Sequence, residues 1–276
     1  MSWTEVDGRR VRYELSGPAD AETIVMLHGI GRSLEDWEPQ RPRLGTDHRM
    51  LTLDLPGFGL SPRLPAPTTL DGLAAAVWAT LDTLGFTAPI HLMGNSLGGA
   101  VAMRMTADSP DRVTTLTLAN SAGFGPEVTF ALRVLAVPFL GRSLLRRLDP
   151  RTARRVERSI FHDRANVTAE RVAMAVKIGR QPDFIPVYLE IARALGGFRG
   201  IAPAWRDDLL PRVTSHPKPT LIVWGDRDQI LPSTHLATAK TIFPYAETHL
   251  FPDTGHMPQL ERPDEFAALV RPLLTR

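Results

Sequence analysis

One stretch, residues 90–100, limits the folds open to this chain more than any other. It reads as a short apolar strand, a sharp turn with Ser96 at its tip, and the start of a helix, in the pattern G-x-S-x-G. A serine on such a turn adopts a strained backbone conformation, and the flanking positions must be small, as Gly94 and Gly98 are. The helix N-terminus behind it favours a developing anion. The pattern predicts a nucleophilic Ser96, against the alternative of a glycine turn with an incidental serine.

Apolar runs that read as strands alternate with stretches that read as helices. Asp7-Gly8 is a strong turn signal and predicts a β-hairpin over residues 3–16. A helix capped by Thr68 or Thr69 precedes the serine turn. Further strands are expected at residues 23–27, 50–53, 113–119, 220–224 and 248–251, and helices at 97–110, after 232, and at 263–274. This alternation predicts an α/β fold, a mostly parallel central sheet with helices on both faces.

The alternation stops between residues 124 and 206. This segment is helical in character, contains no convincing strand, and is interrupted by Pro182, Pro186 and the pair Gly196-Gly197. It holds 15 Lys and Arg against 7 Asp and Glu, in a chain whose formal net charge is +2. We interpret the excess as arginine on solvated helices. A basic surface that attracts anionic substrates or lipid is the alternative.

Composition narrows the functions to be considered. The chain has no cysteine, which excludes disulfides and thiolate metal sites. The first residues lack the features of a signal peptide, and no apolar run reaches the roughly 20 residues that span a bilayer. We therefore expect a soluble, cytoplasmic protein that acts on a small molecule, without nucleic-acid partners or membrane insertion. The sequence leaves the oligomeric state open.

A nucleophilic serine needs a base within hydrogen-bond reach and a carboxylate that orients the base. In an open α/β sheet, such groups follow the carboxyl ends of strands. Asp226 and Asp228 follow the strand at 220–224, and His256 follows the strand at 248–251. The order serine, aspartate, histidine differs from the order in chymotrypsin-type and subtilisin-type sites.

With these motifs in this order, the chain resembles the α/β-hydrolase fold superfamily, in its lid-bearing, cofactor-free branch of serine esterases and C–C bond hydrolases. The resemblance implies a core of residues 1–123 and 207–276, with a helical cap inserted at 124–206. The family pattern W-G-x-x-D-x-x-x-P selects Asp228 over Asp226 as the triad acid, beside Ser96 and His256. The motifs that carry the resemblance are His28-Gly29, the loop 54–59, the turn 94–99, Trp224 to Asp228 with Pro232, and Gly255-His256.

An oxyanion hole requires two backbone N–H groups aimed at the developing negative charge. The resemblance assigns them to Leu97, which follows the nucleophile, and to Ile30, which follows His28-Gly29. We expect His28 to support this loop and not to carry a proton. Neither the histidine spacings nor the glycine loops imply a metal or a cofactor, and the remaining histidines are His48, His91, His162, His216, His235 and His249.

The expected reaction is hydrolysis of small to medium apolar carboxylic esters through an acyl-enzyme. The substrate-binding residues are unknown, and the segment 124–206 is suspected to supply them. Its first part offers an apolar wall, although most of these side chains are expected to pack the lid onto the core: Phe130, Leu132, Val134, Leu135, Val137, Phe139 and Leu140.

Two alternatives stay open. One is a C–C bond hydrolase for ring-cleavage dienoates, a group in which a glycine-rich run follows His-Gly and an aromatic residue often follows the base. This chain has Arg32 in that run and Met257 after the base, and only Arg171 and Arg180 bracket the place of an expected cap arginine. The other alternative is a ligand-binding protein, or a non-hydrolytic enzyme, that keeps the triad.

Overall fold

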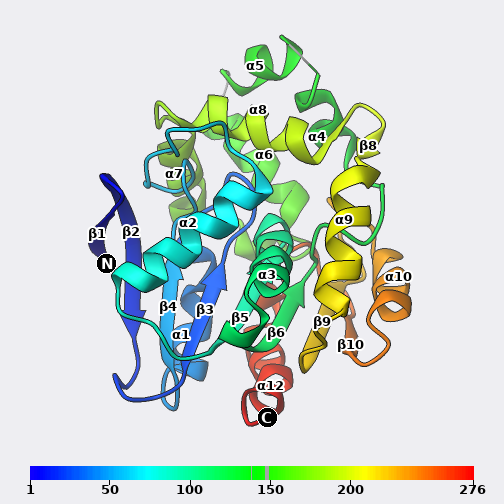
Figure 1. Cartoon of the computed structure of the whole chain (residues 1–276). Helices are drawn as coiled ribbons and strands as arrows, with labels where there is room; N and C mark the ends of the chain where they lie inside the picture. The colour runs from blue at the N-terminus through cyan, green and yellow to red at the C-terminus, as the bar shows by residue number, and fades with distance from the viewer. Residues whose placement is uncertain (138, 147–148) are drawn as a thin grey trace.

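An eight-stranded sheet forms the centre of the protein, whose computed structural model describes residues 1–137, 139–146 and 149–276 (Figure 1). The strand order is β1-β2-β4-β3-β5-β6-β9-β10, and the pairs β1–β2 and β2–β4 are antiparallel while the others are parallel. The mostly parallel α/β sheet predicted from the sequence is confirmed. The strands are β1 (Ser2–Val6), β2 (Arg9–Ser16), β3 (Thr23–Leu27), β4 (Arg49–Leu53), β5 (Ile90–Asn95), β6 (Val113–Ala119), β9 (Thr220–Gly225) and β10 (Glu247–Phe251).

Helices cover both faces of this sheet. One face packs on α2 (Leu70–Thr83), α3 (Leu97–Asp108), α9 (Pro203–Thr214) and α10 (His235–Ile242). The other face packs on the 3₁₀ helix Leu34–Gln40, α1 (Arg41–Leu44), α11 (Pro258–Glu261) and α12 (Pro263–Leu274). Because both faces are covered, every residue of β3, β5 and β9 is buried, as the continuous apolar runs predicted.

Local signals in the sequence are confirmed at the hairpin and at the first long helix. Asp7 and Gly8 have φ of 50° and 73°, the left-handed values that the tight turn requires. Thr69, not Thr68, is the N-cap of α2, because its hydroxyl accepts a hydrogen bond from Gly72 N at 3.0 Å. Gly85, with φ of 80°, follows the last turn of that helix.

Five helices of the segment 124–206 stand over the carboxyl ends of the strands (Figure 1). We call residues 124–206 the cap segment. Its end at 206 falls inside α9, which begins at Pro203 and packs against α3. The helices over the sheet are α4 (Phe130–Leu135), α5 (Leu140–Leu145), α6 (Pro150–Ile160), α7 (Ala169–Gly179) and α8 (Phe184–Leu195).

Two expectations for the cap segment were wrong. A short antiparallel pair, β7 (Gly196–Gly197) and β8 (Gly200–Ile201), lies where no strand was expected, and Gly200 reaches it with φ of 106°. Pro186 does not break a helix, because it lies in the first turn of α8, where the backbone N–H needs no partner within the helix. Pro138, which interrupts the apolar stretch 128–140, lies outside the described residues. No helix in the described ranges is long and apolar enough to cross a membrane.

Candidate active site

Ser96 lies at the tip of the turn between β5 and α3 with φ of 56° and ψ of −117°, a conformation that L-residues rarely adopt. Its carbonyl oxygen accepts hydrogen bonds from Gly99 N and Ala122 N, both at 3.1 Å, which hold the strained turn. A Cβ on Gly94 would come 2.2 Å from Gly98 O, and one on Gly98 would come 2.2 Å from Leu27 O. The close approach of backbone that the G-x-S-x-G pattern predicts is therefore present.

Asp228 and His256 meet at the carboxyl ends of β9 and β10, as predicted. His256 Nδ1 lies 2.7 Å from Asp228 Oδ2, and the Asp228 side chain has no exposed surface. The other carboxylate oxygen of Asp228 accepts hydrogen bonds from Ile230 N at 2.7 Å and from Leu231 N at 3.1 Å. Such a carboxylate holds one tautomer of the imidazole, with Nε2 available for a proton. Asp226 instead accepts from Thr254 N at 3.2 Å, away from the imidazole.

Two asparagines that the sequence analysis did not single out hold this pair in place. Asn120 Nδ2 donates to Asp228 Oδ2 at 2.6 Å, and Asn120 is the first residue after β6, with φ of 45°. Asn95, in the turn that carries Ser96, donates through Nδ2 to His256 O at a distance of 3.0 Å. Both follow the rule that polar groups at the carboxyl ends of neighbouring strands meet. Applying that rule to β6 would have found Asn120.

The loop that begins at His28 passes directly beside Ser96. A Cβ on Gly29 would lie 3.2 Å from Ser96 Cβ, so a side chain there would crowd the serine. Within the described ranges, the amides of Ile30 and Leu97 donate no hydrogen bond to another protein group. Free amides in this position are what an oxyanion hole requires.

His28 lies behind the oxyanion loop and makes only structural contacts. It is fully buried, its Nδ1 donates to Gly29 O at 2.8 Å, and its Nε2 accepts from Leu55 N at 2.9 Å. Burial lowers the pKa of His28, so the ring stays neutral at pH 7. The contacts match a supporting role for His28.

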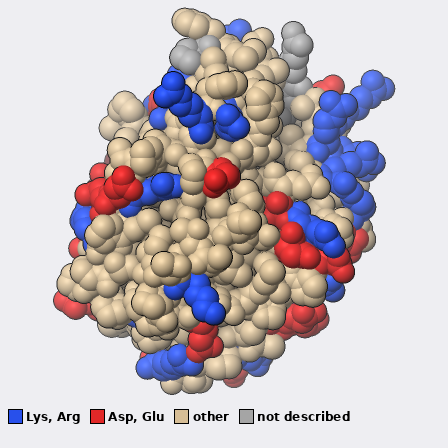
Figure 2. All heavy atoms as spheres, turned by 90° about the vertical axis from the view of Figure 1, so that its right-hand side faces the viewer, with Lys and Arg blue, Asp and Glu red and all other residues tan. Residues whose placement is uncertain are grey.

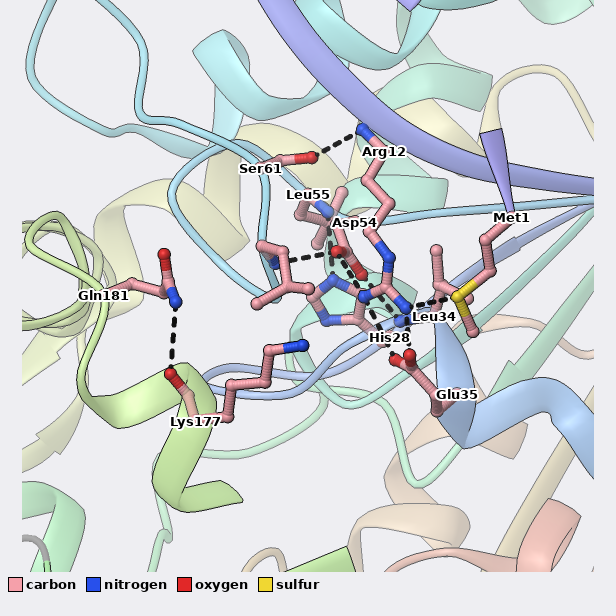
Figure 3. A network of polar contacts seen from close by, with 11 residues as sticks. Met1, Arg12, His28, Leu34, Glu35, Asp54, Leu55, Ser61, Lys177 and Gln181 are labelled. Carbon is pink, nitrogen blue, oxygen red and sulfur yellow. Dashed lines mark hydrogen bonds and ion pairs between the residues drawn. The ribbon is translucent and has the colours of Figure 1, made fainter. Parts of the chain in front are cut away.

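Asp54, on the loop after β4, ties three parts of the chain together behind that histidine (Figure 3). Its carboxylate accepts from Leu34 N at 2.9 Å and from Leu60 N at 2.8 Å. The guanidinium of Arg12, on β2, donates to it at 3.0 Å. The motif at 54–59 thus orders the backbone that follows the oxyanion loop.

A cavity of about 380 Å³ lies between the core and the cap segment, and both Ser96 and His256 line it. Its remaining wall is mostly apolar and comes from the oxyanion loop, α4, α6 and α8. Ser96 also lines a smaller cavity of about 80 Å³, whose wall includes Leu97, Trp205 and Leu231. Ser96 therefore borders two mostly apolar compartments of unequal size.

The expected apolar wall is only partly correct. Of the seven residues proposed for it, Leu132 and Leu135 line the larger cavity. Phe130, Phe139 and Leu140 are exposed to solvent, at 64%, 90% and 46%. Apart from Arg133, every side chain of α4 is apolar, so the sequence does not say which side of the helix faces the core. In the structure, none of its residues is fully buried.

An ion-pair network joins the cap segment to the oxyanion loop. Arg32, two residues after Ile30, donates to Asp36 through Nε at 2.9 Å and Nη2 at 2.7 Å, and through Nη1 to Glu157 on α6. Glu157 is completely buried. No pattern in the sequence links these two partners, because they are 125 residues apart.

A second junction joins the cap segment to the histidine loop. His256 N donates to Ile160 O, at the end of α6, at 2.8 Å. Glu261 accepts from Gly255 N at 2.8 Å with one oxygen, and from His162 N at 2.8 Å with the other. The backbone of the base is therefore bonded directly to the cap segment.

Comparison with known proteins assigns the family. The model of the α/β hydrolase fold family matches residues 22–263, so the chain belongs to this family. Among solved structures, meta-cleavage product hydrolase from Pseudomonas fluorescens IP01 superimposes with a TM-score of 0.83 at 23% identity. That alignment covers 100% of this chain and 97% of the other, and it shows a common fold.

The names of two relatives describe different activities, one an acetyltransferase component and the other a hydrolase. The chain is 34% identical, over 98% of its length, to the dihydrolipoyllysine-residue acetyltransferase component of the acetoin cleaving system of Cupriavidus necator, of which it covers 67%. It is 29% identical, over 92% of its length, to 2-hydroxy-6-oxononadienedioate/2-hydroxy-6-oxononatrienedioate hydrolase of Pseudomonas sp., of which it covers 88%.

Proposed function

We propose that the protein is a serine hydrolase that cleaves carboxylic esters of small to medium apolar substrates, with residues 124–206 as its cap. The observation that carries this proposal is that His256, held by the buried Asp228 at 2.7 Å, lines the same cavity as Ser96. A serine at a strained strand-to-helix turn, next to free amides and an oriented imidazole, is equipped for acyl transfer.

In the proposed mechanism, His256 takes the proton of Ser96 as the hydroxyl attacks the carbonyl carbon. The amides of Ile30 and Leu97 bind the resulting oxyanion, and Asp228 stabilises the imidazolium. His256 then protonates the leaving alcohol, and water repeats the cycle on the acyl-enzyme. The two apolar compartments beside Ser96 would receive the acyl and alcohol parts of an ester.

The direct test is hydrolysis of p-nitrophenyl esters across a series of acyl lengths, with the Ser96→Ala variant as control. We expect turnover by the wild type and a loss of about 10⁴-fold or more in kcat for the variant, because the nucleophile is removed. A fluorophosphonate probe should label the wild type at Ser96. A wild type that neither turns over any ester nor reacts with the probe would refute the proposal.

A C–C bond hydrolase for dienoates is the second candidate. Its support is the relative from Pseudomonas sp. together with Arg155, a cap residue that lines the larger cavity and offers a cation for a substrate carboxylate. Arg171 and Arg180 are absent from the described lining of that cavity. The two candidates are separated by comparing kcat/KM for 2-hydroxy-6-oxo-6-phenylhexa-2,4-dienoate with kcat/KM for p-nitrophenyl butyrate. If the protein cleaves only the ester, the C–C bond hydrolase is ruled out.

A further inference from the structure

A cluster of metal-binding side chains lies at the end of the sheet opposite to Ser96. The amino ends of β3, β4 and β5 are neighbours, and Glu22 precedes β3, His48 precedes β4, and His91 is the second residue of β5. One ligating atom from each side chain lies within 4.8 Å of the other two. Their sequence separations match no metal-ligand spacing, so the cluster exists only because three parallel strands start together.

One distance within the cluster is that of two groups that share a cation. His91 Nε2 and Glu22 Oε2 are 3.4 Å apart, which is long for a direct hydrogen bond. Two ligands bound to Zn²⁺ at their usual lengths in a tetrahedral site are separated by about 3.4 Å. The ring of His48 stands at 83° to that of His91 with the centroids 5.8 Å apart. A ring nitrogen of this half-buried side chain already lies within 4.8 Å of the ligating atoms of Glu22 and His91, so binding requires an inward movement of His48.

His91 has the supporting contact that a metal ligand needs. Its side chain is 2% exposed, and Nδ1 lies 2.9 Å from Oγ1 of Thr115 on the neighbouring strand β6. With the proton on Nδ1 donated to that hydroxyl, Nε2 presents its lone pair toward Glu22. A hydrogen bond from the second ring nitrogen, which fixes the tautomer and the ring, is the usual arrangement for ligating histidines.

The surroundings do not oppose a cation. The guanidinium of Arg49, next to His48, lies over the ring of Phe86 at 4.7 Å and donates to Ala19 O at 3.2 Å, away from the cluster. Glu22 is 70% exposed and supplies the one negative charge of the set. Two imidazoles and one carboxylate with room for water are a ligand set that zinc uses in proteins.

We propose that Glu22, His48 and His91 bind a zinc ion that joins the amino ends of β3, β4 and β5. The site has no part in the reaction proposed at Ser96, and its existence does not depend on that proposal. A cation held by three strands stabilises the folded chain, because the unfolded chain does not bring these ligands together.

The test is calorimetric titration of ZnCl2 into untagged, EDTA-treated protein at neutral pH. We expect one zinc per chain, and at least about tenfold weaker binding in His48→Ala and in Glu22→Gln. His216→Ala, which removes an exposed histidine outside the cluster, is the matched control and should bind like the wild type. Zinc should also raise the melting temperature of the wild type, reversibly with EDTA, and leave that of His48→Ala unchanged.

Two results would overturn the proposal. One is a wild type whose dissociation constant for zinc is weaker than about 1 mM, the range of a non-specific surface contact. The other is zinc binding that persists in both His48→Ala and Glu22→Gln, which would place the ion elsewhere. Circular dichroism of each variant checks folding, and Glu22→Gln, at an exposed position, keeps the test decisive if His48→Ala does not fold.

Discussion

The core and the cap segment differ in how much apolar packing stabilises each of them. In the core, β3, β5 and β9 have no exposed residue, and large apolar clusters fill both faces of the sheet. In the cap segment, α4 has no fully buried residue, and the apolar clusters are small. Its docking onto the core combines apolar contacts, in which Val187 and Ile191 of α8 join the main core cluster, with ion pairs and backbone hydrogen bonds. Because outer helices such as α4 bury little apolar surface, we expect the cap segment to open at lower cost than the sheet.

The docking contacts also explain how charge is distributed over the cap segment. Three of its seven acids face the core. Glu157 pairs with Arg32, Glu190 pairs with the guanidinium of Arg63, and Asp183 accepts a hydrogen bond from the backbone N of Arg63. With the acids used in docking, the arginines dominate the outer surface. On the face shown in Figure 2, Lys and Arg outnumber Asp and Glu at the cap end, while the lower half mixes both signs.

The largest effect on the core side is expected from Asp228→Asn. The amide cannot hold the imidazole in the tautomer that accepts the serine proton, so kcat should fall by about 10³- to 10⁴-fold. Stability should also fall, by about 1–3 kcal/mol, because an NH2 group replaces one buried oxygen and faces the donors Asn120 Nδ2 and His256 Nδ1. Steady-state kinetics with p-nitrophenyl butyrate and urea denaturation measure the two quantities.

Asp226→Asn is the matched control for that experiment. This carboxylate lies two residues away and accepts a hydrogen bond from Thr254 N, with no contact to His256 among the described interactions. Its kcat should stay within a few-fold of the wild type. If Asp226→Asn lost more activity than Asp228→Asn, the assignment of the triad acid would be reversed.

On the cap side, Glu157→Gln should loosen the docking of α6. The change removes a charge from a buried pair, at a cost of about 1.5–3 kcal/mol, with Asp36 still bound to Arg32. We expect amide hydrogen exchange in α6 to accelerate about ten- to hundredfold, while exchange in β5 stays the same. Glu170→Gln, an exposed carboxylate on α7, is the control. Equal acceleration in α6 and β5 would mean that the two regions unfold as one unit.

A smaller effect is expected from Arg63→Ala. Nη2 of Arg63 bonds both oxygens of Glu190, at 2.8 and 3.0 Å, but the two side chains are 30% and 27% exposed. A pair so exposed contributes about 1 kcal/mol at most. Exchange in α8 should accelerate about fivefold or less, and Arg193→Ala on the same helix should have no such effect. A change above about twentyfold would show that this pair is the main attachment.

The last prediction concerns the pH dependence of core stability. Burial lowers the pKa of His28, so the unfolded chain binds a proton that the folded chain does not. The stabilisation is complete above the unfolded pKa near 6.5 and is lost as the pH falls below it, with a slope of up to about 1.4 kcal/mol per pH unit. Urea denaturation between pH 7.5 and 5.5 measures this slope. Stability that rises as the pH falls would contradict the neutral state of His28.

The sequence predicts the core better than the cap segment for a physical reason. In a parallel sheet, the order of strand ends fixes where side chains meet, so Ser96, Asp228 and His256 could be placed from motifs and turns alone. The docking of helices over that sheet depends on side-chain contacts between distant residues. Arg32 and Glu157 carry no joint signal in the sequence. For the same reason Leu132 could not be separated from Phe130 before the orientation of α4 was known.

The glycines of the serine turn limit which amino-acid substitutions this fold can accept. Each Cβ added at Gly94 or Gly98 would meet backbone atoms at 2.2 Å, and backbone cannot move aside as a side chain can. A substitution there would push β5 or α3 away from its neighbour and misplace the nucleophile. Substitutions are therefore tolerated more readily at positions such as Leu132 and Leu135, which line the larger cavity without being fully buried. Under the proposed function, substrate preference can change there while the serine turn keeps its shape.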